Sequence, residues 1–467
     1  MSESRSEATR YREVVTLAAA AALASWLLPL AAPESSATPP AGTAQTHPVS
    51  TCFWEGPIST KRKATNGFDG RYFNFPEESA TYWLSRFNLD GGERLVLHGR
   101  YPHGRYMSLN AYSDGTPTDA LSDVAIRPRP GSTNPFEVSA RRDLGKRSFR
   151  VAVVDDPAPD DPAAREPNTL YAQAGPGASI EVVYRVYEAD RGLGLTGGVD
   201  LPRQVLRNEG SGEVKRGEVA CAQINDSNRE ITVQTIPAAA WQAARNSPGC
   251  DGDTNPGYDP VRWERFFNIN YASLAVITDC TEAGRQSRLA MAVESEGGFY
   301  SNRDSAYIYA HLAREFGPVL AIRGTLPRFQ ATQGAPRRMP AGELRFWSLC
   351  TGESRVTTRT PDCLADRQVL AQSGRRYTIV VSEPADRPAN ARAECGVAWL
   401  RWGNRGDGAG DAGYGLLIMR NMLSMPDFDE AIQRVGAPSH EREVMNEHFP
   451  RSRYTTREAF EAEGCPA

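Results

Sequence analysis

Aspartates a few residues apart occur at two places in the sequence where they could do chemistry. Asp119 and Asp123 follow a Gly-Thr-Pro turn, and two carboxylates can act as general acid and base or bind a cation together. The simpler interpretation is that these aspartates shape a turn or cap a short helix. Catalysis by Asp119 and Asp123 is therefore the alternative to a structural role.

The second place resembles the beginning of a calcium-binding loop. Asp251, Asp253 and Asn255 alternate along the chain, as the first oxygen ligands of such a loop do. Pro256 stands where that loop needs glycine, and Arg262 stands where it needs a bidentate glutamate. A solvated turn is the simpler interpretation, calcium is the alternative, and we expect no other cofactor.

Four arginines interrupt apolar stretches in two pairs, Arg105 with Arg345 and Arg185 with Arg420. A buried arginine is costly unless a carboxylate pairs with it. An arginine that faces a cleft can instead bind a ligand carboxylate or sugar hydroxyls. The sequence therefore leaves two interpretations open, a structural ion pair present in both halves and a ligand-binding site.

Aromatic and histidine residues supply weaker candidates. Trp399 and Trp402, with Tyr82, Trp83 and Tyr101, could stack on a sugar or an apolar ligand, although core packing is the simpler role. Residues 440–448 (HEREVMNEH) lack the second histidine of the zinc signature H-E-x-x-H, because residue 444 is valine. A solvated amphipathic helix explains this segment as well as a metal does.

An internal repeat predicts the elements that position these residues. Short matches recur in the same order about 225 to 240 residues apart. The matched segments are 79–80 with 305–306, 99–102 with 324–327, 105–109 with 345–349, 149–157 with 377–384, 168–175 with 398–403, and 182–187 with 416–422. Six matches in one order indicate a duplicated unit.

The matched segments have the composition of β-strands. Residues 82–87 are rich in aromatic residues, Asp90-Gly91-Gly92 favours a tight hairpin turn, and 95–97 and 105–112 follow as further strands. Each half is thus predicted to begin with a three-stranded antiparallel meander. We expect a mainly β protein with two related antiparallel, jelly-roll-like β-sandwich domains at 52–210 and 297–425.

Helices are predicted between and after these domains. Residues 211–296 form a connecting segment with helices at 237–247 and 259–277, the latter with an apolar face of Trp263, Phe266 and Phe267. Residues 426–467 are predicted to form C-terminal helices, including 425–435, 439–449 and a last helix capped by Thr455.

The N-terminus and the cysteines indicate export. A charged start, an uncharged run at 14–32 and a small-residue exit predict that 1–37 is a signal peptide or an N-terminal anchor, followed by a Pro/Ala/Thr linker at 38–51. Eight cysteines without a C-x-x-C motif favour disulfides. Cys350 with Cys363 and Cys250 with Cys280 are the predicted local pairs, and the other connectivity stays open.

Composition excludes several classes of protein. Among 467 residues, 40% are hydrophobic, which is too many for a disordered chain. The net charge of −4 gives no basic excess for nucleic acid, so a small molecule or a glycan is the expected partner, and the membrane is expected to contact only the N-terminal segment. A phosphate loop, a dinucleotide fingerprint and a G-x-S-x-G elbow do not occur.

The second half contains a Gly-x-x-Pro step at 324–327, a Phe-Trp-Ser-Leu strand at 346–349 and Trp399-Leu400. With these motifs it resembles a widespread bacterial family of exported proteins with a domain of unknown function. Arg401 stands where that family has proline, so the chain resembles a divergent branch, with the first half following the pattern more loosely. The resemblance implies a β-sandwich and an envelope location, without an activity.

These observations together predict an exported protein of the cell envelope, the periplasm or the extracellular space that binds a ligand or has a structural role. The alternative is a secreted carbohydrate-active hydrolase with Asp119 and Asp123 as its paired carboxylates.

Overall fold

Strands dominate the part of the chain that the computed structural model describes, residues 51–58, 74–175, 178–225, 235–292, 298–369 and 373–465. The predicted mainly β fold is confirmed. Residues His47–Ala467 form one compact unit. The predicted signal or anchor at 1–37, and the predicted linker up to residue 50, lie outside the described residues. No helix in the described ranges is both long and apolar enough to cross a bilayer.

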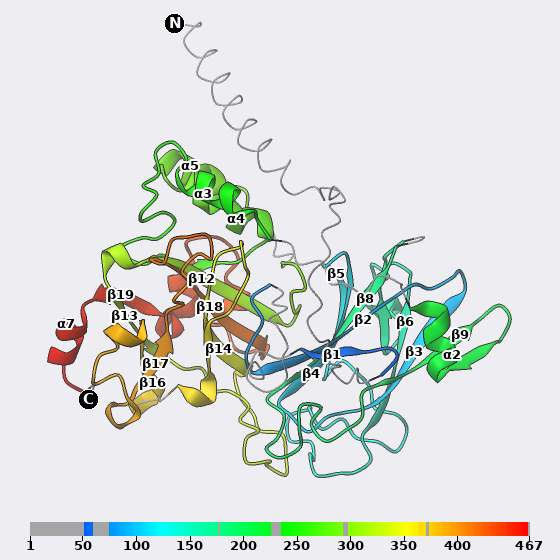
Figure 1. The fold of residues 1–467 in the computed structure, drawn as a ribbon. Helices are drawn as coiled ribbons and strands as arrows, with labels where there is room; N and C mark the ends of the chain where they lie inside the picture. The colour runs from blue at the N-terminus through cyan, green and yellow to red at the C-terminus, as the bar shows by residue number, and fades with distance from the viewer. Residues whose placement is uncertain are drawn as a thin grey trace, which may run out of the picture. The chain divides into compact units, whose positions relative to one another are not determined.

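The first half contributes two five-stranded sheets (Figure 1, blue to green). In sheet order, the first consists of β1 (Glu55–Ile58), β2 (Ala80–Phe87), β8 (Ile180–Tyr187), β4 (Tyr106–Ser113) and β5 (Thr116–Ser122). The second consists of β10 (Val214–Arg216), β9 (Arg203–Asn208), β3 (Glu93–Arg100), β6 (Ser148–Val154) and β7 (Thr169–Tyr171).

The second half repeats this arrangement with one strand fewer. Its first sheet consists of β11 (Glu264–Arg265), β12 (Ser305–Ala313), β18 (Tyr414–Ser424), β14 (Leu344–Gly352) and β15 (Asp362–Ala365). Its second sheet consists of β17 (Val397–Arg401), β16 (Arg376–Ser382), β13 (Val319–Thr325) and β19 (Arg451–Thr455). Each of the six sequence matches falls on strands that occupy equivalent places in the two orders.

One pair in each half departs from the antiparallel expectation. Strands β6 and β7 are parallel, and so are their counterparts β16 and β17. Parallel neighbours need a long crossover, and the connections at 155–168 and 383–396 are long enough to provide it. The second sheet of each half is therefore mixed, and the two halves share this feature too.

The predicted opening meander is wrong. Strand β2 pairs with β1 and β8, so neither of its edges is free for β3. Strand β3 lies in the other sheet, between β9 and β6. The Asp90-Gly91-Gly92 turn, in which Gly92 has a φ of 81°, thus joins two sheets instead of closing a hairpin. Turn residues specify a reversal of the chain but not the strand that receives the hydrogen bonds.

Apolar side chains from both sheets of a half share one core. In the first half, Trp83 and Leu109 of one sheet belong to the same buried cluster as Leu97 and Val151 of the other. The second half has a corresponding cluster. A third cluster joins the halves, because Tyr106, Tyr112 and Tyr187 pack with Phe346 and Met422. The halves therefore contact each other through their first sheets.

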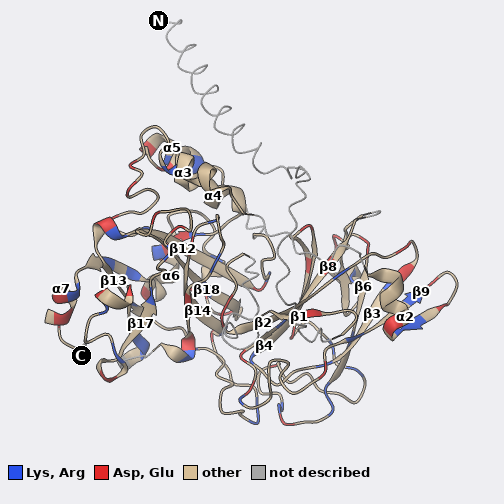
Figure 2. Cartoon of the chain, viewed as in Figure 1, with Lys and Arg blue, Asp and Glu red and all other residues tan. Residues whose placement is uncertain are grey.

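Helices occupy the connecting segment and the C-terminus. They are α2 (Gly217–Ile224), α3 (Ala238–Arg245), α4 (Ile269–Thr278), α5 (Glu282–Leu289), α6 (Glu441–Met445) and α7 (Arg457–Ala462). Figure 1 shows α3, α4 and α5 lying together. Figure 2 shows acidic and basic residues side by side on α7, as expected of a helix on a surface.

Several helix predictions need correction. The predicted helix at 259–277 begins only at Ile269, because Asn268 caps it by accepting from the Tyr271 amide at 2.9 Å. Trp263 lies ahead of the cap, next to strand β11, and packs into the core of the second half. At the C-terminus, 425–435 forms only a short 3₁₀ turn, 451–455 is the strand β19, and Thr456 instead of Thr455 caps α7.

All eight cysteines form disulfides. The predicted pairs Cys350–Cys363 and Cys250–Cys280 are confirmed. Cys350 and Cys363 face each other directly across β14 and β15. The remaining pairs are Cys52–Cys221 and Cys395–Cys465. Four disulfides are typical of a protein that folds in an oxidising compartment outside the cytosol.

Candidate ligand-binding site

Two of the four predicted arginines, one from each half, form reciprocal ion pairs that join the halves. Arg105 of β4 binds Asp366 at 2.6 Å, and Arg345 of β14 binds Asp123 at 3.1 Å. All four side chains are at most 1% exposed. Each aspartate comes directly after an equivalent strand, β5 or β15, so each half supplies one arginine and one aspartate to the other. These ion pairs support a structural role for both arginines, and ligand binding by them stays a prediction.

The proposed catalytic carboxylates are engaged in separate ion pairs. Asp119 binds Arg165 at 2.5 Å and accepts from the Tyr171 amide at 2.9 Å, whereas Asp123 binds Arg345. Burial raises the pKa of Asp123 to about 7, against the opposing charge of Arg345. Neither aspartate lines the cavity described below. Two carboxylates held by different arginines do not form the converging pair that glycoside hydrolysis needs.

The tryptophan candidates are structural as well. Trp402 is 1% exposed and donates to the Tyr414 carbonyl at 3.1 Å. Trp399 is half-buried, donates to Ser382 at 3.0 Å and lies under the guanidinium of Arg387, 4.6 Å from its ring centre. Trp402 is thus buried, whereas Trp399 remains partly exposed. Of the other aromatic candidates, Trp83 and Tyr101 are core residues, and Tyr82 lines the cavity described below.

The calcium-loop candidates form a turn. Asp251 accepts from the Asp253 amide at 3.1 Å, and both aspartates are exposed. The amide nitrogen of Asn255 donates to the carbonyls of Arg245 and Val276, at 3.0 and 2.7 Å. Asn255 thus points its amide nitrogen into the fold, and the local hydrogen bonds explain this stretch without a cation. Calcium binding here stays a prediction.

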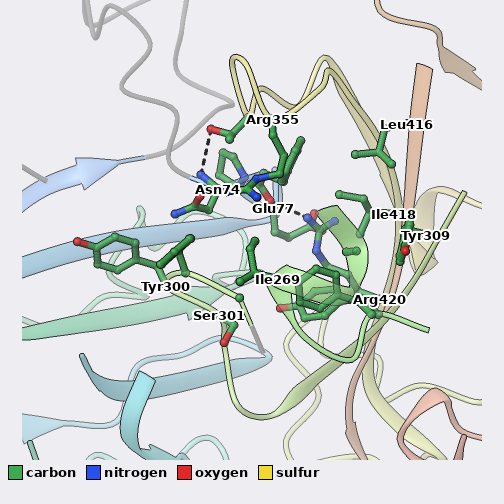
Figure 3. A pocket seen from close by; sticks show the side chains of 18 of the residues that line it. Asn74, Glu77, Ile269, Tyr300, Ser301, Tyr309, Arg355, Leu416, Ile418 and Arg420 are labelled. Carbon is green, nitrogen blue, oxygen red and sulfur yellow. Dashed lines mark hydrogen bonds and ion pairs between the residues drawn. The ribbon is translucent and has the colours of Figure 1, made fainter. Parts of the chain in front are cut away.

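The other two arginines, Arg185 and Arg420, line a cavity between the halves. It encloses about 170 Å³ and takes lining residues from both halves, from α3 and from α4. Figure 3 shows part of this lining, with Glu77 beside Arg420. The lining is mostly apolar and aromatic, and includes Phe75, Tyr82, Tyr187, Trp241, Phe266, Ile269, Val276, Phe299, Tyr307, Tyr309, Tyr414, Leu416 and Ile418.

Register explains why both arginines reach this cavity. Arg185 of β8 stands between Tyr82 of β2 and Ser108 of β4. Arg420 of β18 stands in the same way between Tyr307 of β12 and Ser348 of β14. Each guanidinium also lies over its tyrosine ring, at 5.6 and 5.7 Å from the centre. The duplication thus places two equivalent cation–aromatic pairs at one cavity.

The two arginines differ in what neutralises them. Arg420 binds the Glu77 carboxylate at 3.2 Å, the Phe75 carbonyl at 2.7 Å and the Cys350 sulfur at 2.8 Å. Arg185 donates to the Asn110 side-chain oxygen, the Tyr112 hydroxyl and the Tyr300 carbonyl, each at 2.7 Å. Among the described residues, no carboxylate lies within ion-pairing distance of Arg185. Its charge is solvated by neutral dipoles only.

A third arginine, which the sequence did not single out, lies at the cavity. Arg355 follows β14 and donates to the Ser273 hydroxyl of α4. It too has no carboxylate partner within the described ranges. Burial lowers the pKa of Arg355 to about 10, which still leaves it charged at neutral pH. A buried cation without a counter-charge is costly, so Arg355 adds a second uncompensated positive charge to the cavity.

Among the described residues, the charged lining is positive overall. Three arginines and one glutamate in this part of the chain line the cavity, and together they carry two net positive charges. His311 adds none, because burial lowers its pKa to about 4 and keeps it neutral. A partly open, largely aromatic cavity with two cations that lack a carboxylate partner among the described residues is suited to a ligand that has an anionic group and an apolar body.

The comparisons with known proteins provide no function. The sequence matches no family profile, and no curated protein is similar to it. An uncharacterised protein from Burkholderia cenocepacia has a similar structure, with 12% identity, a TM-score of 0.40 and coverage of 83% of this chain and 79% of that one. The VPA0106 protein from Vibrio parahaemolyticus is 13% identical, with a TM-score of 0.37 and coverage of 82% and 92%. Similarity at this level identifies no ligand or activity.

Proposed function

We propose that this protein is an exported binding protein whose cavity holds a small amphipathic anion, an aliphatic or aromatic carboxylic acid. One observation carries the proposal: Arg185 and Arg355 face a mostly apolar cavity, and neither pairs with a carboxylate among the described residues. A carboxylate from the ligand would supply the missing negative charge.

The apolar lining supports an amphipathic ligand over a sugar. Rings and aliphatic chains from the lining would cover the body of the ligand, and burial of that body would provide most of the affinity. The half-buried Tyr307 hydroxyl makes no hydrogen bond to another described residue, so it is available to the ligand. The lining also includes polar side chains such as Asn74, Ser301 and Thr358, but apolar and aromatic side chains outnumber the polar ones, which favours an apolar ligand body over a glycan.

Export is part of the proposal. The four disulfides support an oxidising compartment, and the sequence of residues 1–37 predicts the signal or anchor that leads there. The Phe-Trp-Ser-Leu strand and the Gly-x-x-Pro step further suggest a divergent member of the exported family with a domain of unknown function. Binding of an envelope-derived or imported acid is consistent with such a location.

The experiment compares acids with alcohols of the same carbon skeleton. Calorimetric titration of the full-length protein would use 3-phenylpropionate against 3-phenylpropanol, and octanoate against octanol. We expect each acid to bind at least about tenfold more tightly than its alcohol, a difference of about 1.4 kcal/mol. Arg355→Met should remove most of this preference, because it deletes an unpaired cation.

A surface variant provides the matched control. The side chain of Arg203 is 79% exposed and is not among the residues that line the cavity, so Arg203→Met should bind the probes as the wild type does. Equal affinity for acid and alcohol would show an apolar pocket without anion selectivity. Failure of all four probes to bind would refute the proposed ligand class.

A further inference from the structure

A cluster of one histidine and two glutamates lies near the C-terminus, outside the cavity. His448, Glu430 and Glu447 each offer one possible ligand atom, and these atoms lie within 4.8 Å of one another. None of the three residues lines the cavity. We propose that they bind a divalent transition-metal ion of the zinc type.

The fold brings the three residues together from two segments. The predicted amphipathic helix at 439–449 breaks after α6, and a 3₁₀ turn, Asn446–His448, follows it. This break turns His448 inward, to 4% exposure, and leaves Glu447 exposed. Glu430 comes from the segment before the 3₁₀ turn at Ile432–Arg434. A site of this kind is closed on the protein side and open to solvent on the side of Glu447. Figure 2 labels α6, which precedes it.

Hydrogen bonds select the tautomer of His448. Its Nδ1 lies 2.8 Å from the Thr325 carbonyl, which can only accept, so Nδ1 carries the proton. The Nε2 lone pair is then directed toward the carboxylates. Metal-binding histidines are commonly oriented in this way by a backbone carbonyl. Asn446 similarly orients Glu430 by donating to its Oε1 at 2.8 Å.

The distance between two of the ligand atoms suits a tetrahedral ion. His448 Nε2 and Glu430 Oε2 are 3.2 Å apart. Ligand atoms bound to zinc at about 2.0–2.1 Å stand about 3.3–3.4 Å from each other at the tetrahedral angle. With Glu447 as the third ligand, the fourth position would be left to water. A mixed imidazole and carboxylate set favours zinc, manganese or iron(II) over calcium.

An ion pair between a protonated His448 and Glu430 is the competing explanation, and Glu447 distinguishes the two. The ion pair does not need Glu447, whereas the metal does. Titration of the full-length protein with Zn²⁺ should show one site. Glu447→Gln should weaken the zinc affinity of that site at least about tenfold, because mutating even a residue that only hydrogen-bonds a metal ligand lowers metal affinity about 10- to 100-fold. Glu443→Gln, an exposed glutamate on α6 outside the cluster, should leave the affinity unchanged.

A second measurement distinguishes metal bound at this cluster from metal bound elsewhere on the protein. Co²⁺ bound by this histidine and two carboxylates should give visible absorption bands, which Glu447→Gln should reduce and Glu443→Gln should preserve. Zn²⁺ should also raise the melting temperatures of the wild type and of Glu443→Gln. It should raise the melting temperature of Glu447→Gln much less. Equal zinc affinity in the wild type and in Glu447→Gln, or no binding to the wild type, would overturn the proposal.

Discussion

The two pairs of equivalent arginines have diverged to different degrees. Arg105 and Arg345 remain symmetric, because each binds the aspartate that follows an equivalent strand of the other half. Arg185 and Arg420 occupy equivalent positions too, but only Arg420 has a carboxylate partner within the described residues. Where both copies keep the same pairing, the arginine stabilises the contact between the halves. Where one copy lacks its counter-charge, the arginine is available to a ligand.

The two symmetric ion pairs differ in how many hydrogen bonds the arginine would keep if its aspartate were removed. Every hydrogen bond recorded for the Arg105 side chain goes to Asp366, whereas Arg345 also donates to the carbonyls of Arg105 and Phe136. Asp366→Ala would therefore leave a buried guanidinium without a partner in the described part of the chain. We expect it to lower the free energy of unfolding by about 3–5 kcal/mol, measured by urea denaturation.

Asp123→Ala provides the internal comparison. Arg345 keeps two carbonyl acceptors in that variant, so the expected loss is smaller, about 1.5–3 kcal/mol. Asp200→Ala removes the exposed partner of Arg203 and should change stability by less than about 0.5 kcal/mol. Equal losses for Asp366→Ala and Asp123→Ala would contradict the view that the remaining carbonyls support Arg345.

The disulfide beside Arg420 marks another difference between the halves. Cys350 aligns with Asn110, and each binds the arginine of its own half. Only in the second half is the residue at this position bonded to the neighbouring strand, because Cys350 of β14 forms a disulfide with Cys363 of β15. The double variant Cys350→Asn/Cys363→Ala restores the residue of the first half and opens a loop of 13 residues. We expect it to cost about 3 kcal/mol in urea denaturation.

Removal of a distant disulfide is the control for that variant. Cys250→Ala/Cys280→Ala opens a loop of 30 residues in the helical segment, so its stability loss should be similar in size. Only the Cys350 variant should also change the affinity for the acid probes, because Cys350 contacts Arg420. The same change of affinity in both variants would indicate a general loss of structure.

The repeat made much of the fold predictable from sequence. Apolar strands with aromatic and β-branched residues recur in one order, and that order survives in the sheets. Local pairs such as Cys350–Cys363 were predictable because few residues separate them. The partner of each strand was not predictable, since the turn at Asp90–Gly92 fits a hairpin and a crossing between sheets equally well. Strand β19 was missed because Arg451–Thr455 is short and polar, and its pairing with β13 joins segments far apart in the sequence.

The candidate site was only partly predictable. The sequence singled out all four arginines because charge inside apolar strands is unusual, but it could not tell which of them has a partner. Asp366 and Glu77 lie 261 and 343 residues from the arginines that they neutralise. Arg355 was missed because it stands in a polar loop between Cys350 and Cys363, with no local sign that α4 would bury it. Partners at such distances are set by the contact between the halves.

Stability should depend on pH through Asp123. Burial raises its pKa to about 7 in the folded protein, from an ordinary value of 3.8. Between these values the folded protein keeps a proton that the unfolded chain releases, so stability falls as the pH rises from about 4 to about 7 and is level above. Burial shifts the pKa of Asp366 in the same direction. Urea denaturation at pH 4.5, 6.0 and 7.5 would measure the slope.

Asp123→Asn isolates this contribution. The variant cannot titrate at this position, so its stability should fall less between pH 4.5 and 7.5 than that of the wild type. Asp200→Asn, at an exposed position, should keep the wild-type slope. Parallel slopes in the wild type and in Asp123→Asn would show that Asp123 ionises at its ordinary pKa.

Arg185 and Arg420 can be compared by removing each with and without its counter-charge. Arg185→Gln removes an uncompensated cation and should weaken binding of 3-phenylpropionate by about tenfold, or 1.4 kcal/mol. Glu77→Gln releases Arg420 from its carboxylate and should strengthen binding severalfold, by about 0.5–1 kcal/mol. The double variant Glu77→Gln/Arg420→Gln deletes both members of one ion pair, so the cavity keeps its two net positive charges.

That double variant is the sharpest comparison between the halves. If the acid is bound by the unpaired cations Arg185 and Arg355, the double variant should retain an affinity within about twofold of the wild type, while Arg185→Gln loses about tenfold. Circular dichroism and melting curves would show that both variants fold, since each glutamine keeps a hydrogen-bonding side chain at its position. If the double variant lost as much affinity as Arg185→Gln, Arg420 would be an equal ligand and the two halves would have kept the same role at this site.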